Sequence, residues 1–170
     1  MIIGLTQGTD PDGLLHATGE FSARFMILAM MLTPALQLSK RFNVGTKWVY
    51  WLMQRRRALG VAAFGYALPH TLIYILDVKL LQDMLSEFWT LGIWTGWLAF
   101  VIFIPLALTS NQASVSALGK TWKKLQLWVY AAAVLTLAHW IFIHNNLAQA
   151  LVLFLPLALL KTYRMSTFIK

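Results

Sequence analysis

The chain has 170 residues, of which 59% are hydrophobic and only 12% are charged, whereas a soluble domain carries about 25% charged residues. With a mean hydropathy of +0.65, the chain lacks the polar surface that a water-soluble fold requires. It contains no cysteine, which excludes disulfides and thiolate metal sites.

Five apolar segments follow one another along the chain, each near the ~20 residues that cross a bilayer as a helix. They cover residues 21–38, 59–76, 88–109, 125–143 and 147–160. We therefore expect an all-α fold, an integral membrane helical bundle of about five transmembrane helices. We expect residues 1–170 to form a single transmembrane domain.

Charged residues are segregated between the two ends of these segments. Residues 40–57, 120–124 and 161–170 hold 12 of the 14 Lys and Arg residues, and residues 10–20 and 77–87 hold all six acids. Because basic residues stay on the cytoplasmic side, we expect the N-terminus outside, the C-terminus in the cytoplasm, and a multi-pass location in a bacterial inner membrane. Topology thus accounts for the net charge of +8, and we expect lipid rather than nucleic acid as partner.

Two histidines lie well inside the apolar segments, His70 in the second and His139 in the fourth. Both segments run away from the cytoplasm. His70 follows Arg57 by 13 residues and His139 follows Lys124 by 15, so at ~1.5 Å per residue they lie about 20 and 23 Å from these basic residues. Two neutral imidazoles at one depth, in the outer half of the bilayer, match the two axial ligands of a b-type haem.

Other interpretations of these histidines stay open. An intramembrane histidine is often a hydrogen-bonded packing residue, and a quinone or proton site is the main competing function. Tyr66 and Tyr74, about one helical turn on either side of His70, suit that competing function. His16 and His144 lie in the outer segments, where we expect them to be solvated rather than bound to metal.

An ordered series of short motifs extends from about Asp10 to the C-terminus. The series is Asp10-Pro11, Thr18-Gly19, Arg24-Phe25 and Thr33-Pro34; Arg56, Leu59-Gly60, Phe64, Tyr66-Ala67 and His70; Gly96, Ala99, Leu106-Ala107 and Thr109-Ser110; and Leu118-Gly119-Lys120, Trp122, Leu125, Val129-Tyr130 and His139. In this order the motifs resemble the ferric-reductase-like transmembrane domain family. Within that family they resemble the haem-binding membrane subunits of bacterial periplasmic methionine sulfoxide reductase systems.

This resemblance implies a b-type cytochrome membrane subunit that mediates transmembrane electron transfer, part of an oxidoreductase system rather than a self-contained enzyme. His70 and His139 would bind the iron of haem b. Arg24 would contact a haem propionate or, equally, pair with Glu20 one turn earlier on the helix. The expected donor is a quinone or a cytoplasmic flavin reductase, and the expected acceptor is a redox protein outside the cytoplasm. The sequence itself indicates no bound flavin or quinone.

The chain departs from the family pattern in two places. The family has a further helix before the Asp10-Pro11 block, and this sequence starts after that point, in agreement with an N-terminus outside. The family also has a histidine 13 residues before the equivalent of His139, where this chain has Gln126. Because an amide is a poor ligand for haem iron, we expect at most one haem per chain.

The missing inner histidine also leaves a second class of function open. The chain would then be a structural or accessory subunit of a larger membrane complex, respiratory or photosynthetic. In that case the haem would be vestigial, or replaced by pigment or lipid.

The predicted topology can be tested by cysteine labelling, since the chain has no cysteine of its own. Single cysteines at Ser86 and Asn146 should react with a membrane-impermeant reagent in intact cells, whereas a cysteine at Ser114 should react only after lysis. The reverse pattern would overturn the orientation.

Overall fold

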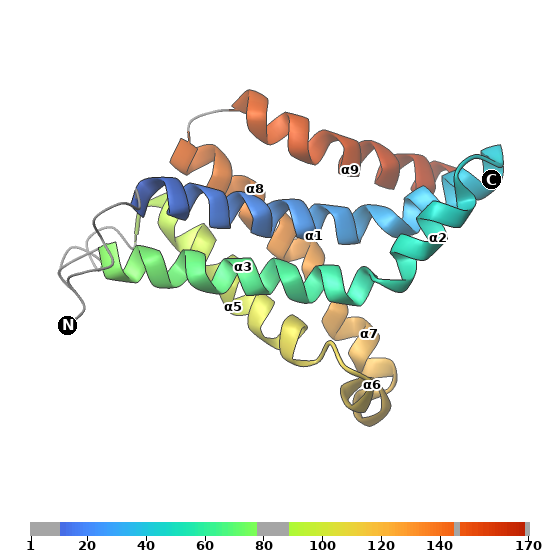
Figure 1. The fold of residues 1–170 in the computed structure, drawn as a ribbon, viewed down its shortest axis with the longest axis horizontal. Helices are drawn as coiled ribbons and strands as arrows, with labels where there is room; N and C mark the ends of the chain where they lie inside the picture. Colours follow the sequence, from blue (N-terminus) through green and yellow to red (C-terminus); the bar gives the residue numbers. More distant parts are fainter. Residues whose placement is uncertain (1–10, 78–88, 145–146, 169–170) are drawn as a thin grey trace.

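The computed structural model describes residues 11–77, 89–144 and 147–168, and these residues form helices joined by turns (Figure 1). Asp10, Ser86 and Asn146, which the sequence analysis singled out, lie outside the described residues. In chain order the helices are α1 (Pro11–Phe42), α2 (Thr46–Gln54), α3 (Arg56–Asp77), α5 (Leu91–Leu108), α6 (Gln112–Leu118), α7 (Lys120–Gln126), α8 (Val129–His144) and α9 (Leu147–Phe168).

Five stretches of this helical chain are long and apolar enough to cross a membrane, which confirms the predicted number of spans. They are α1, α3, α5, the consecutive helices α7 and α8, and α9. The first helix starts well before the predicted residue 21, because residues 11–20 continue the same helix. An acid in its first turn, Asp12, suits the positive end of the helix dipole.

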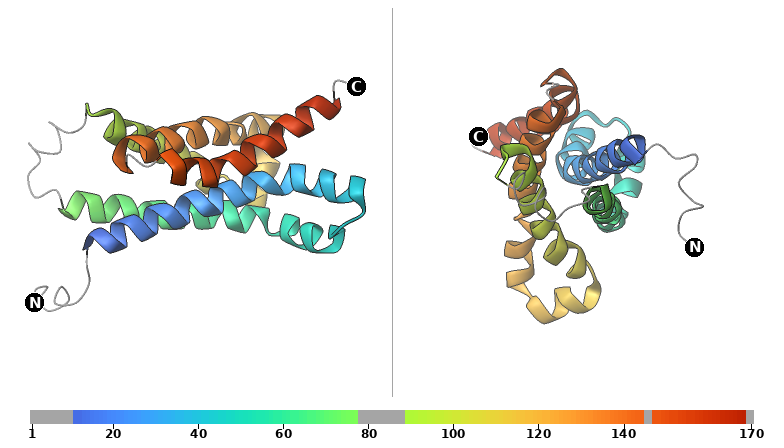
Figure 2. Two further views of the ribbon diagram at one scale, coloured as in Figure 1. Left: turned by 90° about the horizontal axis from the view of Figure 1, so that it is seen from above. Right: turned by 90° about the vertical axis from the view of Figure 1, so that its left-hand side faces the viewer.

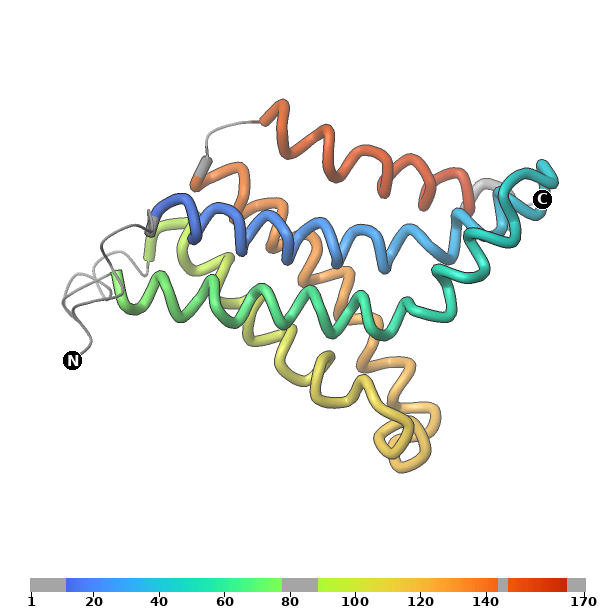
Figure 3. The backbone as a smooth tube through the Cα atoms, in the orientation of Figure 1, coloured from blue at the N-terminus to red at the C-terminus, as the bar shows by residue number. Residues whose placement is uncertain are grey.

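The spans are arranged as two closely packed helix pairs. α1 packs along α3 and α5 packs along α8, whereas the contact between the pairs, through α3 with α5 and α1 with α8, is smaller. Helix α9 lies against α1 and α8. Figure 2 shows the α1–α3 pair on one side of the bundle and α5, α8 and α9 on the other, and Figure 3 traces the path of the backbone through them.

The packed core lies toward the end of the bundle that carries the basic residues. We call this the basic end (Lys40–Arg57, Lys120–Lys124 and Lys161–Arg164) and the opposite end, with Asp12, Glu20 and Asp77, the acidic end. The core is formed by buried residues from five helices, namely Met26, Ile27, Met30, Ala63, Ala67, Phe103, Leu106, Ala132, Ala133, Phe154 and Leu157. Its alanines allow the close helix approach that membrane bundles depend on, since lipid supplies no hydrophobic drive for helices to associate.

Candidate functional site

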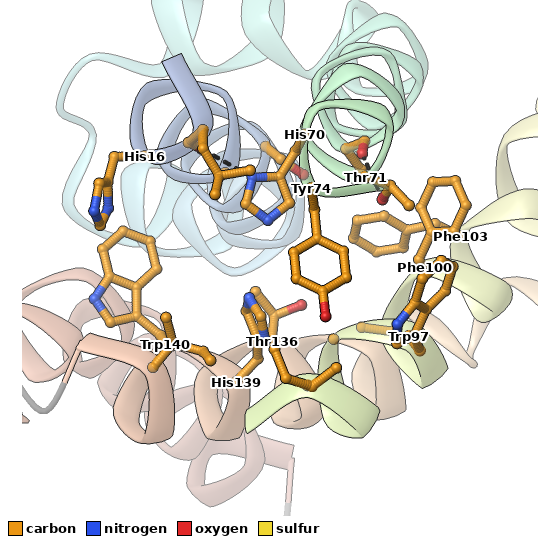
Figure 4. A pocket seen from close by; sticks show the side chains of 18 of the residues that line it. His16, His70, Thr71, Tyr74, Trp97, Phe100, Phe103, Thr136, His139 and Trp140 are labelled. Atoms are coloured by element: carbon orange, nitrogen blue, oxygen red, sulfur yellow. Dashed lines mark hydrogen bonds between the residues drawn. The ribbon is translucent and has the colours of Figure 1, made fainter. Parts of the chain in front are cut away.

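The two predicted histidines meet in a cavity between the helix pairs. His70 on α3 and His139 on α8 have their ring centroids 6.1 Å apart and their ring planes at 88°. The cavity between them has a volume of about 370 Å³, within the range of about 300–1,000 Å³ that holds small ligands and cofactors. Figure 4 shows the two imidazoles pointing into the same space from opposite sides.

Each imidazole is held by a backbone carbonyl of the neighbouring helix in its pair. His70 Nδ1 lies 2.9 Å from the Leu15 carbonyl oxygen on α1, and His139 Nδ1 lies 2.6 Å from the Gly92 carbonyl oxygen on α5. A carbonyl oxygen can only accept, so Nδ1 carries the proton and donates in both rings. In a neutral imidazole the lone pair is then on Nε2, and this arrangement is how proteins orient histidines that bind metal.

Two glycines let the rings reach these carbonyls. A Cβ atom on Gly19 would lie 2.8 Å from His70 Cε1, and a Cβ atom on Gly96 would lie 2.6 Å from His139 Nδ1. Both distances are shorter than carbon atoms tolerate, so only glycine leaves room for the rings. Gly92, one turn earlier on α5, instead leaves room for Ile143, since an added Cβ would lie 2.7 Å from Ile143 Cδ1.

The spacing of the two rings fits two ligands on opposite sides of one metal. A metal–imidazole bond is about 2.0–2.1 Å and the bonded nitrogen lies about one ångström from the ring centre, which gives centroids roughly 6 Å apart. Among the described residues, no group of three or more His, Cys, Asp or Glu side chains could hold a metal ion. A metal here would therefore need other ligands from a cofactor, and a porphyrin supplies four nitrogens in a plane.

The rest of the cavity wall is mostly apolar and aromatic. Tyr74 and Trp97 pack edge to face with centroids 6.4 Å apart, and Phe100 continues the wall beside Trp97. The serine and threonine hydroxyl groups in the wall donate to helix carbonyls: Ser22 to Ala63, Thr71 to Ala67 and Thr136 to Ala132. Because these polar groups already have partners, the wall suits a large, flat, apolar ligand.

The other predicted site residues lie apart from the two rings. Arg24 is half exposed and pairs with Glu20 on α1, and it is not among the residues that line the cavity. Its contact with a propionate stays a prediction. His16 is exposed, as expected, but it also lines the cavity, beside Trp140 in Figure 4. The side chain of His144 lies outside the described residues.

Gln126, where the resemblance led us to expect a second histidine, is part of the packed structure toward the basic end. Its amide nitrogen lies 3.2 Å from the Leu106 carbonyl oxygen and 3.2 Å from Thr109 Oγ1, to which it donates. Trp122 Nε1 donates to the Thr109 carbonyl oxygen at 2.9 Å. These bonds tie α7 to the C-terminal end of α5.

Sequence reasoning missed the parts of the site that belong to the neighbouring helices. The carbonyls of Leu15 and Gly92 cannot be identified from residue types, since every residue has a carbonyl. The glycines do give a sequence signal. Gly92 and Gly96 are four residues apart, which is the spacing of small residues that brings membrane helices together. That pattern could have indicated the close approach of α5 and α8.

Comparisons with known proteins identify a family and a group of similar sequences. The sequence profile of the family described as ferric reductase like transmembrane component matches residues 18–137, a range that contains His70 and stops just before His139. No solved structure matches this chain.

The chain is also similar to bacterial proteins named protein-methionine-sulfoxide reductase heme-binding subunit MsrQ. It is 31% identical to the protein of Azospira oryzae over 92% of this chain and 67% of the relative. It is 34% identical to that of Agrobacterium fabrum over 78% of this chain and 59% of the relative, and 36% identical to that of Brucella anthropi over 74% and 54%. The chain thus spans between about half and two thirds of the length of these relatives.

Its five apolar helices and its bacterial relatives identify the chain as a multi-pass protein of the bacterial inner membrane. The profile match covers more than half of the sequence. Of the helices that line the cavity, it includes all of α3 and α5 and most of α1. The chain therefore belongs to the ferric reductase like transmembrane component family.

Proposed function

We propose that the chain is a b-type cytochrome membrane subunit that binds one haem b through His70 and His139. The observation that carries this proposal is the pair of imidazoles 6.1 Å apart, each with its Nδ1 proton on a carbonyl of the neighbouring helix. The names of the relatives, which include heme-binding subunit, support the same cofactor. When bound, haem would supply reversible one-electron redox chemistry.

The residues of the chain would orient the cofactor and exclude water from it. The carbonyls of Leu15 and Gly92 hold the two rings in place, and hydrogen bonding to Nδ1 makes each imidazole a stronger donor to metal. Trp97 and Phe100 would cover the edge of the ring system on one side of the cavity. A dry apolar wall of this kind is one of the means by which proteins set the potential of haem iron.

We further propose that the cavity lies in the outer half of the bilayer and serves an acceptor outside the cytoplasm. The cavity-lining residues of α1 and α3 include Leu15, His16, Tyr74 and Asp77, which lie toward the acidic end of each helix. The relatives are named as subunits of a methionine sulfoxide reductase, which supports a reductase of that kind as acceptor. A quinone or a cytoplasmic reductase is the proposed donor.

The proposed ligands can be tested by alanine substitution and visible spectroscopy. Purified wild-type protein should show the sharp bands of low-spin b-type haem on reduction. His70→Ala and His139→Ala should each abolish this spectrum, because each removes one of two axial ligands, whereas His144→Ala should retain it. An unchanged spectrum in either of the first two variants would exclude that histidine as a ligand.

The glycine contacts give a second prediction. Gly19→Ala and Gly96→Ala each place a methyl group against a histidine ring, and such overpacking costs about 1–3 kcal/mol. Each variant should therefore unfold at lower temperature and bind less haem. Gly60→Ala and Gly65→Ala on α3 are the matched controls, since an added Cβ meets nothing within 4 Å there, and alanine favours a helix interior by about 0.5–1 kcal/mol.

Electron paramagnetic resonance adds a readout of ring orientation. Perpendicular imidazole planes, as in the 88° pair here, give low-spin ferric haem a strongly anisotropic signal dominated by one large g value. Residual haem in Gly19→Ala or Gly96→Ala should show an altered g value, and the two control variants should keep that of the wild type. Equal effects in all four variants would contradict the proposed fit of the rings.

Haem stoichiometry tests the prediction that the chain binds one haem. Gln126 is held by hydrogen bonds to Leu106 and Thr109, and the buried side chains of Met26, Met30 and Phe103 fill space between the cavity and the basic end. A pyridine haemochrome assay combined with quantitative amino-acid analysis should give a ratio of about one haem per chain, since a six-coordinate haem needs two axial ligands. A ratio near two would require a second ligand pair and would overturn the single-site proposal.

A further inference from the structure

We propose that the corner formed by α2 and its flanking residues binds the headgroups of anionic phospholipids at the basic end of the bundle. We call residues 40–57, which join α1 to α3, the α2 corner. This surface lies far along the helices from the histidine cavity, so the proposal is independent of haem binding.

The α2 corner has a defined conformation. Asn43 and Gly45 adopt positive φ angles of 54° and 65°, which turn the chain sharply between α1 and α2. Thr46 Oγ1 donates to the Ser39 carbonyl oxygen at 3.2 Å and lies 3.2 Å from the Ser39 hydroxyl. These contacts hold the start of α2 against the end of α1, and Figure 1 shows α2 set at an angle to both α1 and α3.

The start of α3 is fixed as well. Arg56 Nε donates to the Ala29 carbonyl oxygen on α1 at 3.0 Å, so this arginine, although exposed, is also part of the contact between the helices. With both of its ends attached to α1, α2 presents the same side chains outward in a constant orientation.

Helix α2 has one face toward the bundle and one largely exposed face. Val49, Leu52 and Met53 are half buried on the first face. Trp48 and Trp51 are 75% and 46% exposed on the second, and Val44 just before the helix is 70% exposed. Because Trp48 and Trp51 are three residues apart, their side chains lie along a single stripe of the helix.

Basic side chains border this aromatic stripe. Arg55 places its guanidinium carbon 3.6 Å from the centre of the Trp51 ring and donates from Nη1 to the Trp51 carbonyl oxygen at 3.1 Å. The exposed cations of the corner are Lys40, Arg41, Lys47, Arg55, Arg56 and Arg57. Guanidinium and ammonium groups of this kind bind phosphate through charge-assisted hydrogen bonds.

Among the residues that the structure describes, no carboxylate side chain forms an ion pair with these cations. In the sequence, no acid lies between residues 21 and 76 or after residue 87. An anionic partner can therefore supply the compensating charge. Between lipid and an acidic protein, the aromatic stripe favours lipid, because Trp side chains prefer the level of the lipid headgroups.

The position of α2 supports the same choice. It directly joins the ends of two membrane spans, which keeps it at the membrane surface. A short helix with an aromatic face and bordering cations is the pattern of an interfacial helix that binds anionic lipid. The phosphates would contact Lys47, Arg55 and their neighbours, and the tryptophans would lie at the boundary between the headgroups and the acyl chains.

Native mass spectrometry of the full chain in detergent tests this proposal. The protein is mixed with equal amounts of phosphatidylglycerol and phosphatidylcholine that have the same acyl chains. The wild type should retain phosphatidylglycerol in clear excess. Lys47→Gln combined with Arg55→Gln should lower its retention by more than about fivefold, since each cation near the surface contributes roughly that factor.

The matched control is Lys123→Gln combined with Lys124→Gln, which removes the same charge from exposed positions on α7 at the same end. It should keep the preference of the wild type. Trp48→Ala should weaken retention of both lipids. If Arg55→Gln alters the helix content in circular dichroism, Lys47→Gln with Arg57→Gln replaces it. Equal retention of both lipids by the wild type, or equal losses in the α2 and α7 variants, would overturn the proposal.

Discussion

The hydrogen bond from each histidine ring to a carbonyl of another helix is the interaction on which the cavity depends. It sets the proton position, the ring direction and the distance between helices at once, because the ring reaches the carbonyl only if the helices are nearly in contact. That requirement explains Gly19 and Gly96, which lie directly against the two rings. A side chain at either position would push the helices apart and break the hydrogen bond between the histidine ring and the carbonyl.

The bundle divides along its length into a cavity and a solid core. Toward the acidic end, the helix pairs diverge around the space between His70 and His139. Toward the basic end, Met26, Met30 and Phe103 fill the corresponding space, and methionine is well suited to irregular gaps. The same helices thus provide a binding space at one level and a packed core at the next.

The sequence predicted the features that depend on local composition and on distance along a helix. Hydropathy predicted the five spans. Counting residues from Arg57 and Lys124 predicted that His70 and His139 would lie at one level, and their ring centroids are 6.1 Å apart. The partners of the rings could not be predicted, since Leu15 and Gly92 are 55 and 47 residues away in the chain and act through their backbones. The place of His16 in the cavity wall also depends on the packing of α1 against α3, which periodicity alone does not determine.

The division into helix pairs has a consequence for biosynthesis. Each histidine and its carbonyl partner belong to one antiparallel hairpin that is continuous in the sequence, α1 with α3 or α5 with α8. A ribosome delivering this chain to the membrane therefore translates all residues of one half of the site before the first residue of the other half. Insertion and ligand orientation can proceed hairpin by hairpin, and only the joining of the two preformed halves has to wait for the finished chain.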